Sequence, residues 1–445
     1  MAQSSLVQTD NSINPITLAR NSVVVLALGF AEIVLMYLLQ IFLARWMGTT
    51  QYGIYEYVIT LSLLLAIPAS LGLPRVVVRF INEYREQKNW GLLRGLILGS
   101  WQLTLGTGLL IGLFGTGAIF LINHYYHFSY APILHIGIWL VPLQGLVLLQ
   151  EDMGRGTKNL ILAYAPTKVI WPVLVILGGF LLWHNRHLLN SISMIWIALG
   201  TLGVVIAIQG SWMWFKFDRD ITPTTPVYTP FAWLQISLPL LLSRGFREIL
   251  MQTDTLLLGA FIGASAVGIY TPASKTALWV NFILQSINVV IDPTFAILNV
   301  RGDRAELQKV ISTVTLWVFW SSSAIALFLF IFAKPILGVF GSEFVEAHWV
   351  LKILVIGQLV NALCGSVGNL LAMTGYQNKL MLVSIVTALI NVVLHTIAIP
   401  LWGTIGAALS TALALSIWNI WLVAIAIRNL KINPTVFSNL FPLKN

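Results

Sequence analysis

Residues 43–55, LARWMGTTQYGIY, are repeated 215 positions later as residues 258–270, LGAFIGASAVGIY, and this repeat decides how the chain is organised. The two copies share the first leucine, the glycine five residues after it and the closing Gly-Ile-Tyr. Each copy lies where one long apolar run ends and the next begins. A repeat over this distance predicts two halves with the same order of helices.

The composition is that of a protein surrounded by lipid. Of the 445 residues, 58% are hydrophobic and only 9% are charged, whereas about a quarter of an ordinary globular domain is charged. A helix needs about 20 mostly apolar residues to cross a bilayer, and such runs follow one another from Ser22 to Ile427. The predicted fold class is therefore an all-α integral membrane protein with about twelve transmembrane helices.

The predicted spans form two sets of six. They are approximately 22–44, 53–73, 95–122, 132–150, 160–183 and 192–215, followed by 231–258, 269–298, 310–333, 348–372, 381–401 and 404–427. Residues 216–230 separate the sets and include the proline-rich ITPTTPVYTP, which is typical of a linker. We expect an N-terminal lobe (1–215), a cytoplasmic linker (216–230) and a C-terminal lobe with a short tail (231–445), related as parallel repeats.

Lysines and arginines between the spans predict the orientation, because short cytoplasmic loops retain positive charge. One face of the predicted topology holds 17 of the 25 basic residues and the other holds three, Arg45, Arg186 and Lys334, while five lie inside helices. This asymmetry places both termini in the cytoplasm. It also accounts for the net charge of +9, and no basic run with interleaved aromatic residues indicates a nucleic-acid partner.

Ionisable side chains inside spanning helices are expensive, so they usually face a bundle interior or an aqueous cavity. The helix predicted over 231–258 has the most of them. At about 100° per residue, a stripe about 120° wide contains Arg244, Arg247, Glu248, Met251, Asp254 and Thr255. One interpretation is a structural ladder in which Arg244 pairs with Glu248. The other is an anion site, since two arginines meet one nearby glutamate.

Two further predicted helices contain charged residues that allow more than one interpretation. The helix over 269–298 has a polar stripe ending at Asp292, which lines either a cavity or a neighbouring helix, and Lys275 points away from that stripe. Glu32 lies in the middle of the first span, where the repeat offset sets it opposite Arg247. An ion pair between the halves and a protonatable coupling site are both compatible with that position.

Lys168 and His395 receive opposite interpretations. Lys168 lies between Pro166 and Pro172, and a lysine in a kinked membrane helix indicates a cavity. His395 shares a helix face with polar residues including Asn391, which is more typical of a hydrogen-bonded packing seam than of a proton relay.

We expect neither catalysis nor a cofactor. The chain has no GxxxxGK[ST] phosphate-binding loop, no HExxH and no Cys/His metal spacing, and Cys364 is its single cysteine. Any driving force for transport must then come from an ion gradient or from consumption of the substrate downstream. The sequence predicts a non-enzymatic membrane protein without a metal site.

A series of short motifs runs along nearly the whole chain. They are Arg20-Asn21-Ser22, Phe42-Leu43-Ala44-Arg45, Tyr52-Gly53-Ile54-Tyr55, Leu71-Gly72-Leu73, Asp254-Thr255, Val267-Gly268-Ile269-Tyr270, Gly341-Ser342-Glu343-Phe344 and Met373-Thr374-Gly375. Each motif alone is loose, and the specificity lies in their order and spacing. In that order they resemble the Wzx-type polysaccharide biosynthesis flippases of the multidrug/oligosaccharidyl-lipid/polysaccharide (MOP) exporter superfamily.

The resemblance implies a two-lobed, MATE-like transporter. Such a protein flips an undecaprenyl-diphosphate-linked oligosaccharide across the bacterial plasma membrane for O-antigen or exopolysaccharide synthesis. Its partners would be that substrate, membrane lipids and the polysaccharide polymerase machinery. We expect the cations Arg244, Arg247, Lys168 and Lys275 to line an inter-lobe cavity and bind the diphosphate, and the acids Glu32, Glu248, Asp254 and Asp292 to couple ions or balance charge.

Two rival functions stay open. An ion-coupled multidrug or small-molecule exporter of the same superfamily would share the fold, but its cavity should be net acidic. A polytopic glycan polymerase or glycosyltransferase would need a catalytic carboxylate or a large outer loop. Here the outer connections are short, and only Glu343 and Glu346 plainly lie in one.

Overall fold

The computed structural model is almost entirely helical in the part of the chain that it describes, which comprises residues 15–126, 130–157, 159–185, 189–220 and 224–439. Three basic residues used to predict the orientation, Lys158, Arg186 and Lys444, lie outside these ranges. Within them there is no strand, so the predicted all-α class is confirmed. A helix satisfies its own backbone hydrogen bonds, which the hydrocarbon core of a bilayer cannot do.

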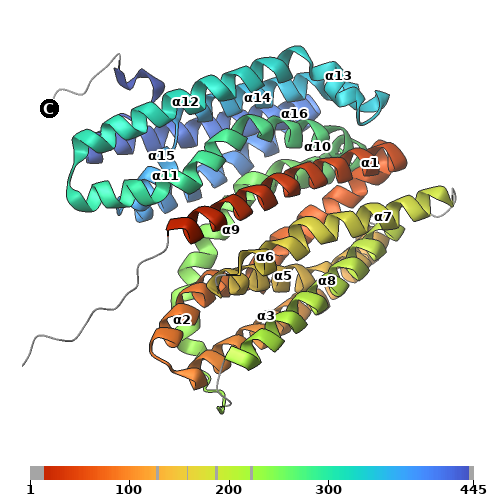
Figure 1. The fold of residues 1–445 in the computed structure, drawn as a ribbon. Coiled ribbons are helices and arrows are strands. Elements are labelled where there is room, and N and C mark those ends of the chain that lie inside the picture. Colours follow the sequence, from red (N-terminus) through yellow and green to blue (C-terminus); the bar gives the residue numbers. More distant parts are fainter. Residues whose placement is uncertain (1–14, 127–129, 158, 186–188, 221–223, 440–445) are drawn as a thin grey trace, which may run out of the picture.

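The helices form two bundles, with α1 and α9 at the junction between them (Figure 1). The first half comprises α1 (Pro15–Ala69), α2 (Leu73–Glu86), α3 (Trp90–Tyr126), α4 (Ala131–Gly137), α5 (Leu140–Gly156), α6 (Leu160–Ala165), the π-helical turn η1 (Pro166–Ile170), α7 (Trp171–His184) and α8 (Ser191–Asp220). The second half comprises α9 (Pro230–Phe261), α10 (Ala264–Ala277), the 3-10 turn η2 (Leu278–Asn281), α11 (Phe282–Arg301), α12 (Arg304–Ile331), α13 (Ala333–Gly338), the 3-10 turn η3 (Ser342–Ala347), α14 (His348–Cys364), α15 (Val367–Met373), α16 (Gln377–Ile425), the π-helical turn η4 (Ala426–Leu430) and η5 (Val436–Asn439).

Eight helical stretches among the described residues are long and apolar enough to cross a membrane. Two of them, in α1 and α16, bend at a glycine with non-helical backbone angles, Gly48 and Gly403, and each therefore contains two of the predicted spans. The predicted spans 231–258 and 269–298 are also helical, in α9 and α10 to α11, but they do not reach the same apolarity. The total of about twelve crossings stays a prediction.

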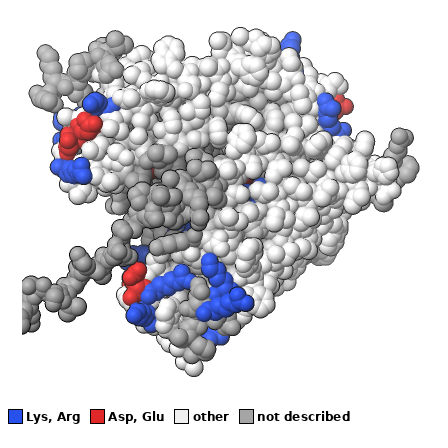
Figure 2. All heavy atoms as spheres, in the orientation of Figure 1, with Lys and Arg blue, Asp and Glu red and all other residues white. Residues whose placement is uncertain are grey.

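Charged side chains on the visible face of the molecule gather at its two ends (Figure 2). A broad band with almost no lysine, arginine, aspartate or glutamate separates them. Such a band is what a protein presents to the hydrocarbon core of a bilayer, where an exposed charge is expensive.

The two repeat copies have similar backbone conformations at corresponding glycines. Gly48 has φ 72° and ψ 173°, and Gly263, its counterpart 215 residues later, has φ 117° and ψ 179°. Positive φ combined with extended ψ is open almost only to glycine. Each glycine turns the chain from one helix into the next.

The other conserved pair of the repeat, Gly53 and Gly268, brings the two halves into backbone contact. A Cβ atom on Gly53 would lie 1.8 Å from the carbonyl oxygen of Ala264, and one on Gly268 would lie 2.0 Å from that of Thr49. Any larger side chain would force α1 and α10 apart. The internal repeat therefore forms the contact by which the halves meet at this end.

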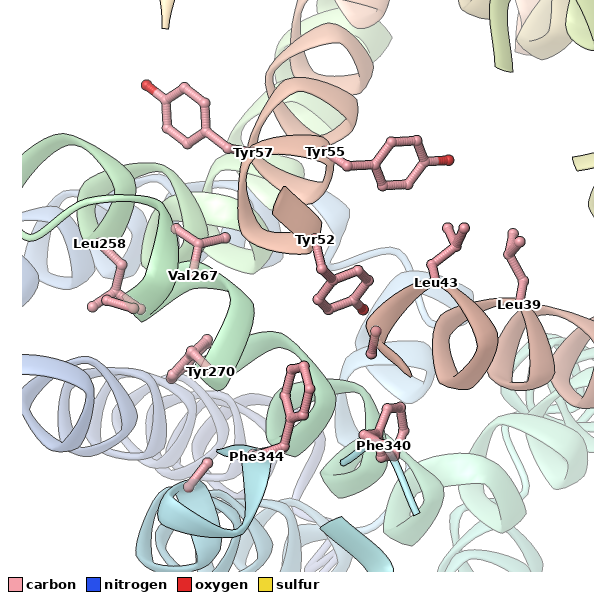
Figure 3. Close-up of a cluster of buried hydrophobic side chains, with 14 of the residues drawn as sticks. Leu39, Leu43, Tyr52, Tyr55, Tyr57, Leu258, Val267, Tyr270, Phe340 and Phe344 are labelled. Atoms are coloured by element: carbon pink, nitrogen blue, oxygen red, sulfur yellow. The ribbon is translucent and has the colours of Figure 1, made fainter. Parts of the chain in front are cut away.

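Aromatic residues from both halves pack near this contact, and Tyr52, Phe340 and Phe344 among them are buried (Figure 3). Tyr52 of α1 packs edge-on against Phe344 of η3, with ring centroids 6.2 Å apart, and Tyr37 packs in the same way against Phe340 at 5.4 Å. These pairs join the first half to the second by apolar packing, which keeps this end of the molecule closed.

The segment between the halves is bound to the first half. The predicted linker begins inside α8, which continues to Asp220. Further on, the backbone N–H of Val227 donates to the carbonyl of Gly91 at 2.9 Å, and a Cβ on Gly95 would lie 1.9 Å from the carbonyl oxygen of Val227. Trp233, in the first turn of α9, is fully buried in the core of the first half.

The contact between the repeat copies can be tested by cross-linking. The hydroxyl oxygens of Thr49 and Ser265, one in each copy, lie 3.4 Å apart, so T49C/S265C should form a disulfide in native membranes when the single native cysteine is removed by C364S. Gel mobility under non-reducing conditions measures the yield. Co-expressed single variants control for bonds between molecules, and a double variant that stays reduced under oxidation would show that the halves do not meet here.

Candidate functional site

Arg247 lies near the middle of α9, the helix that contacts both halves through α1, α2, α10 and α16. Its side chain is exposed, and among the side chains that the structure describes none forms an ion pair with it. Glu248 instead accepts a hydrogen bond from Gln252 at 3.0 Å. The backbone of Arg244 is helical, but its side chain lies outside the described part, so the predicted pair with Glu248 stays untested.

Asp254 belongs to the same predicted stripe but points into the protein. Only 6% of the residue is exposed. Its carboxylate accepts hydrogen bonds from the Tyr270 hydroxyl at 2.8 Å and from the backbone N–H of Thr255 at 2.7 Å. The charged stripe of α9 is therefore divided, with Arg247 exposed and Asp254 enclosed by the second half.

Lys168 forms an ion pair with Glu32, and both belong to the first half. The Lys168 Nζ atom lies 2.5 Å from Oε2 of Glu32, with 23% and 33% of the two side chains exposed. The predicted alternative of a pair between Glu32 and Arg247 is therefore wrong. The ammonium also lies 5.1 Å from the centre of the Tyr164 ring.

The backbone around Lys168 explains how this lysine is presented. Pro166 and Pro172 flank it, and neither has a backbone N–H to donate to the preceding turn. The chain responds with the π-helical turn η1, in which the N–H of Trp171 donates to the carbonyl of Pro166. Such turns bulge a helix and are frequent at functional sites.

A second carboxylate faces the same lysine. Glu151 of α5 accepts a hydrogen bond from the Thr167 hydroxyl at 2.7 Å and interacts electrostatically with both Lys168 and Glu32. Next to it, Asp152 forms an ion pair with Arg155 at 2.6 Å. Two glutamates therefore share one ammonium, so this cluster gains favourable interactions from a bound cation or proton as well as from Lys168.

Lys275 and Asp292 have partners of different kinds. Lys275 of α10 interacts electrostatically with Glu56, a buried residue of α1, so this interaction links the halves. Asp292 of α11 receives both of its 2.9 Å hydrogen bonds from the Asn369 amide of α15. Of the two interpretations of the polar stripe in 269–298, this contact supports the one in which the stripe packs against a neighbouring helix.

Sequence reasoning assigned no role to Glu151 or to Glu56. The predicted span 132–150 ended one residue before Glu151, whereas α5 continues to Gly156. Glu56 lies near the start of the predicted span 53–73, a position from which a side chain can reach the membrane interface. It is buried because α1 resumes directly after the turn at Gly48, which places Glu56 two turns into a packed helix.

The first half also holds an apolar cavity of about 500 Å³ between α3, α5 and α8. Its lining includes Ile97, Trp101, Met153, Ile206, Trp214 and Phe217. These lining side chains carry no cation, so the cavity does not match the cationic site that the sequence predicts. Among the described residues, no group of three or more His, Cys, Asp or Glu side chains is placed to bind a metal ion.

The pair of Lys168 with Glu32 can be tested by a double-mutant cycle. K168M should lower the melting temperature in detergent micelles, because it leaves two carboxylates without their counter-charge, and E32Q should recover part of the loss in the double variant. We expect a coupling energy of about 1 kcal/mol, since the groups are only partly exposed.

K352M is the matched control for K168M. Lys352 is another lysine inside a helix, but among the described residues its ammonium is recorded against aromatic rings alone, those of Phe330 and Trp349, at 4.6 and 4.8 Å. Strictly additive effects of E32Q and K168M would contradict the ion pair.

The fold is shared with solved transporters. A multidrug resistance MATE family transporter of the MOP superfamily, in its inward-facing conformation, superposes with a TM-score of 0.73 at 14% identity, covering 92% of this chain and 99% of the other. The lipid II flippase MurJ, in an inward closed conformation, gives a TM-score of 0.70 at 14% identity over 91% of this chain and 87% of MurJ. These likenesses confirm the predicted MATE-like architecture.

Sequence comparisons point to one family. The probable low-salt glycan biosynthesis flippase Agl15 of Haloferax volcanii is 23% identical over 413 residues, which cover 90% of this chain and 81% of Agl15. The family model described as MatE matches residues 239–397. The family model described as polysaccharide biosynthesis protein matches residues 18–299, more than half of the chain. The chain thus belongs to the polysaccharide biosynthesis protein family and is a multi-pass membrane flippase of the MOP superfamily.

Proposed function

We propose that this flippase moves an undecaprenyl-diphosphate-linked oligosaccharide from the cytoplasmic to the outer leaflet of a bacterial plasma membrane, for surface polysaccharide synthesis. The Agl15 relative is itself described as a glycan biosynthesis flippase, and MurJ as a lipid II flippase. A substrate of this class carries a diphosphate, which requires cations, on a lipid tail, which requires access from the bilayer.

The observation that carries the proposal is that Arg247 is exposed and forms no ion pair with any described side chain. An arginine in the middle of a membrane helix is expensive unless it has a partner or faces water. The side chain is exposed, and its described neighbours supply no carboxylate. Because α9 contacts both halves, a guanidinium at this position, together with Arg244 one turn earlier, is suited to bidentate hydrogen bonds with a phosphate group between the lobes.

The two lysines have a different role in this proposal. Lys168 and Lys275 each interact with a glutamate, Glu32 and Glu56 respectively. A diphosphate that binds either lysine must compete with that carboxylate. In this proposal the glutamates, together with Glu248 and Asp292, balance charge while the site is empty, so that the intramembrane cations are not left unpaired between transport cycles.

The closed contact of Gly53 with Gly268 suggests which side the substrate enters from. Both glycines lie at the end of the molecule that the predicted orientation assigns to the outside. With that end closed, the arginines of α9 are reached from the cytoplasmic end, where the lipid-linked precursor would be made. Transport then follows as the lobes rock about the site, and the delivered substrate is consumed by a polysaccharide polymerase machinery.

The proposal is tested by replacing both arginines. R244A/R247A should abolish surface glycan in a complementation assay, because the diphosphate loses its cations, while membrane insertion and protein level stay unchanged. R301A/R304A is the matched control, since it removes two arginines at the same spacing from the connection between α11 and α12. Normal glycan in the R244A/R247A strain would refute the cationic site.

An ion-coupled multidrug exporter is the second candidate, favoured by the MatE match over residues 239–397. A deletion strain distinguishes the two functions. The flippase proposal expects lost surface glycan with unchanged drug susceptibility, whereas drug hypersensitivity with intact glycan would support the exporter.

A further inference from the structure

The apolar cavity of the first half lies between α3 and α8, on the side of that half turned away from the bundle of α10–α16 (Figure 1). Both helices pack against α5, but the side chains between them leave a groove of about 500 Å³. Two of the lining residues, Trp214 and Phe215, are 43% and 68% exposed, so the groove opens on the surface. In a membrane this surface faces lipid.

A row of small residues forms the α8 wall of the groove. Gly203, Ala207, Gly210 and Ser211 have the i, i+4, i+7, i+8 spacing of one helix face. In membrane proteins such a row normally packs directly against a neighbouring helix. Here no described protein atom lies within 4 Å of the position that a Cβ atom would take on Gly203. A face with the composition of a helix contact therefore meets the groove.

Trp101 of α3 holds the two helices apart. Its indole N–H donates to the sulfur of Met153 in α5 at 3.2 Å. A Cβ on Gly210 would lie 2.4 Å from the edge of the same ring, so the indole touches the backbone of α8. At Gly203, two turns away from this contact, the side chains of α3 do not reach the α8 face.

The dimensions of the groove fit a single hydrocarbon chain. Its lining extends along α8 from Gly203 to Phe217, which is about 21 Å. A volume of about 500 Å³ over that length corresponds to a width of about 5 Å. Carbon atoms in contact lie about 4 Å apart, so a hydrocarbon chain fits. A further helix, about 10 Å wide, does not.

The groove spans one leaflet of the bilayer. In the predicted orientation α3 begins at the cytoplasmic end, at Trp90, and α8 ends there, at Asp220. The lining starts at Ile97, two turns into α3, and reaches Phe217 in the last turn of α8. A bilayer with its headgroups is about 40–45 Å thick, so one leaflet measures about 21 Å. The length of the groove matches that of the cytoplasmic leaflet.

Arg94 lies beyond the cytoplasmic end of the lining. It precedes Leu98 and Trp101 by one and two turns, so it shares their face of α3. Helical side chains lean toward the N-terminus of their helix, which for α3 is the cytoplasmic end. The residue is half-buried, and no described side chain forms an ion pair with it. Its guanidinium is suited to a phosphate at the level of the lipid headgroups.

We propose that this groove binds one glycerophospholipid of the cytoplasmic leaflet, with an acyl chain between α3 and α8 and the phosphate at Arg94. The lipid supplies the packing contact that the two helices do not make with each other. Water is a poor occupant, because the apolar lining gives it few hydrogen-bond partners. The tail of an undecaprenyl-linked substrate is much longer than one leaflet, and the groove does not border Arg247 of α9. The site therefore does not depend on the cargo.

Binding of phosphatidylglycerol to the full-length protein, stripped of lipid in detergent, tests the site. Native mass spectrometry counts the retained lipid, and a thermal melt measures the stabilisation. Phosphatidylglycerol should raise the melting temperature by about 3 °C. Diacylglycerol, which lacks the phosphate, and glycerol phosphate, which lacks the chains, should each raise it by less than about 1 °C.

G203L tests the acyl-chain position. A leucine side chain fills the groove without displacing protein, because the space at this Cβ is open. The variant should lose the retained lipid and the thermal shift, while its melting temperature without lipid stays at or above that of the parent. G200L is the matched control: Gly200 has equally open surroundings on α8 but lies outside the lining, so this variant should bind as the parent does.

R94Q tests the phosphate position. It should weaken phosphatidylglycerol binding by about tenfold, because a charge-assisted bond to the phosphate is lost, and leave the response to diacylglycerol unchanged. R428Q is the matched control. It removes an exposed arginine from the cytoplasmic end of the second half in the predicted orientation, far from the groove, and should leave binding unchanged.

Three results would overturn the proposal. They are a thermal shift by phosphatidylglycerol that persists in G203L, binding to R94Q as tight as to the parent, or displacement of the bound lipid by undecaprenyl phosphate at lower concentrations than by a second phospholipid. The last would assign the groove to the tail of the substrate. Because the assay measures no glycan, its outcome is independent of the R244A/R247A test.

Discussion

The packing of the two halves depends on the close approach of two backbones at Gly53 and Gly268. At this point no side chain fits between α1 and α10, so the contact exists only because both repeat copies keep a glycine there. The turns at Gly48 and Gly263 bring the helices to that contact, and the aromatic residues around it then pack across the boundary. Small residues at a helix crossing give close van der Waals contact where lipid provides no hydrophobic driving force.

The helical fold could be predicted because one physical requirement dominates in a bilayer. Long apolar runs must satisfy their own backbone hydrogen bonds, so length and apolarity identify the helices without knowledge of their neighbours. Because Gly48 and Gly263 occupy the same position in the two repeat copies, the sequence also predicts that the chain turns in the same way at both. The structure gives them similar backbone angles. The comparisons confirm the superfamily that the ordered motifs indicated.

The partners of the charged residues could not be predicted in the same way. A helical wheel gives the direction of a side chain relative to its own helix, but not the helix that it meets. For this reason the sequence did not identify the partner of Glu32. Glu32 pairs with Lys168, which lies in the π-helical turn η1, and not with Arg247. The sequence predicts that Arg247 and Asp254 share one stripe of α9, yet Asp254 is enclosed and Arg247 is exposed, because the packing partners of α9 change along its length. The sequence predicts that His395 lies in a hydrogen-bonded packing seam, and its two ring nitrogens do bond within α16, to the carbonyl oxygen of Asn391 and, beyond the bend at Gly403, to Thr411.

The binding of the inter-half segment to the first half gives α9 a mechanical role. Trp233 holds the beginning of this helix in the core of one half, and Asp254, near its end, is held in the core of the other. A helix fixed at both ends transmits the relative rotation of the two bodies as bending between its anchors. Pro239, which lacks a backbone N–H, and Gly245 lie between those anchors. A rotation of the halves should therefore bend α9 in the same few turns that carry Arg244 and Arg247.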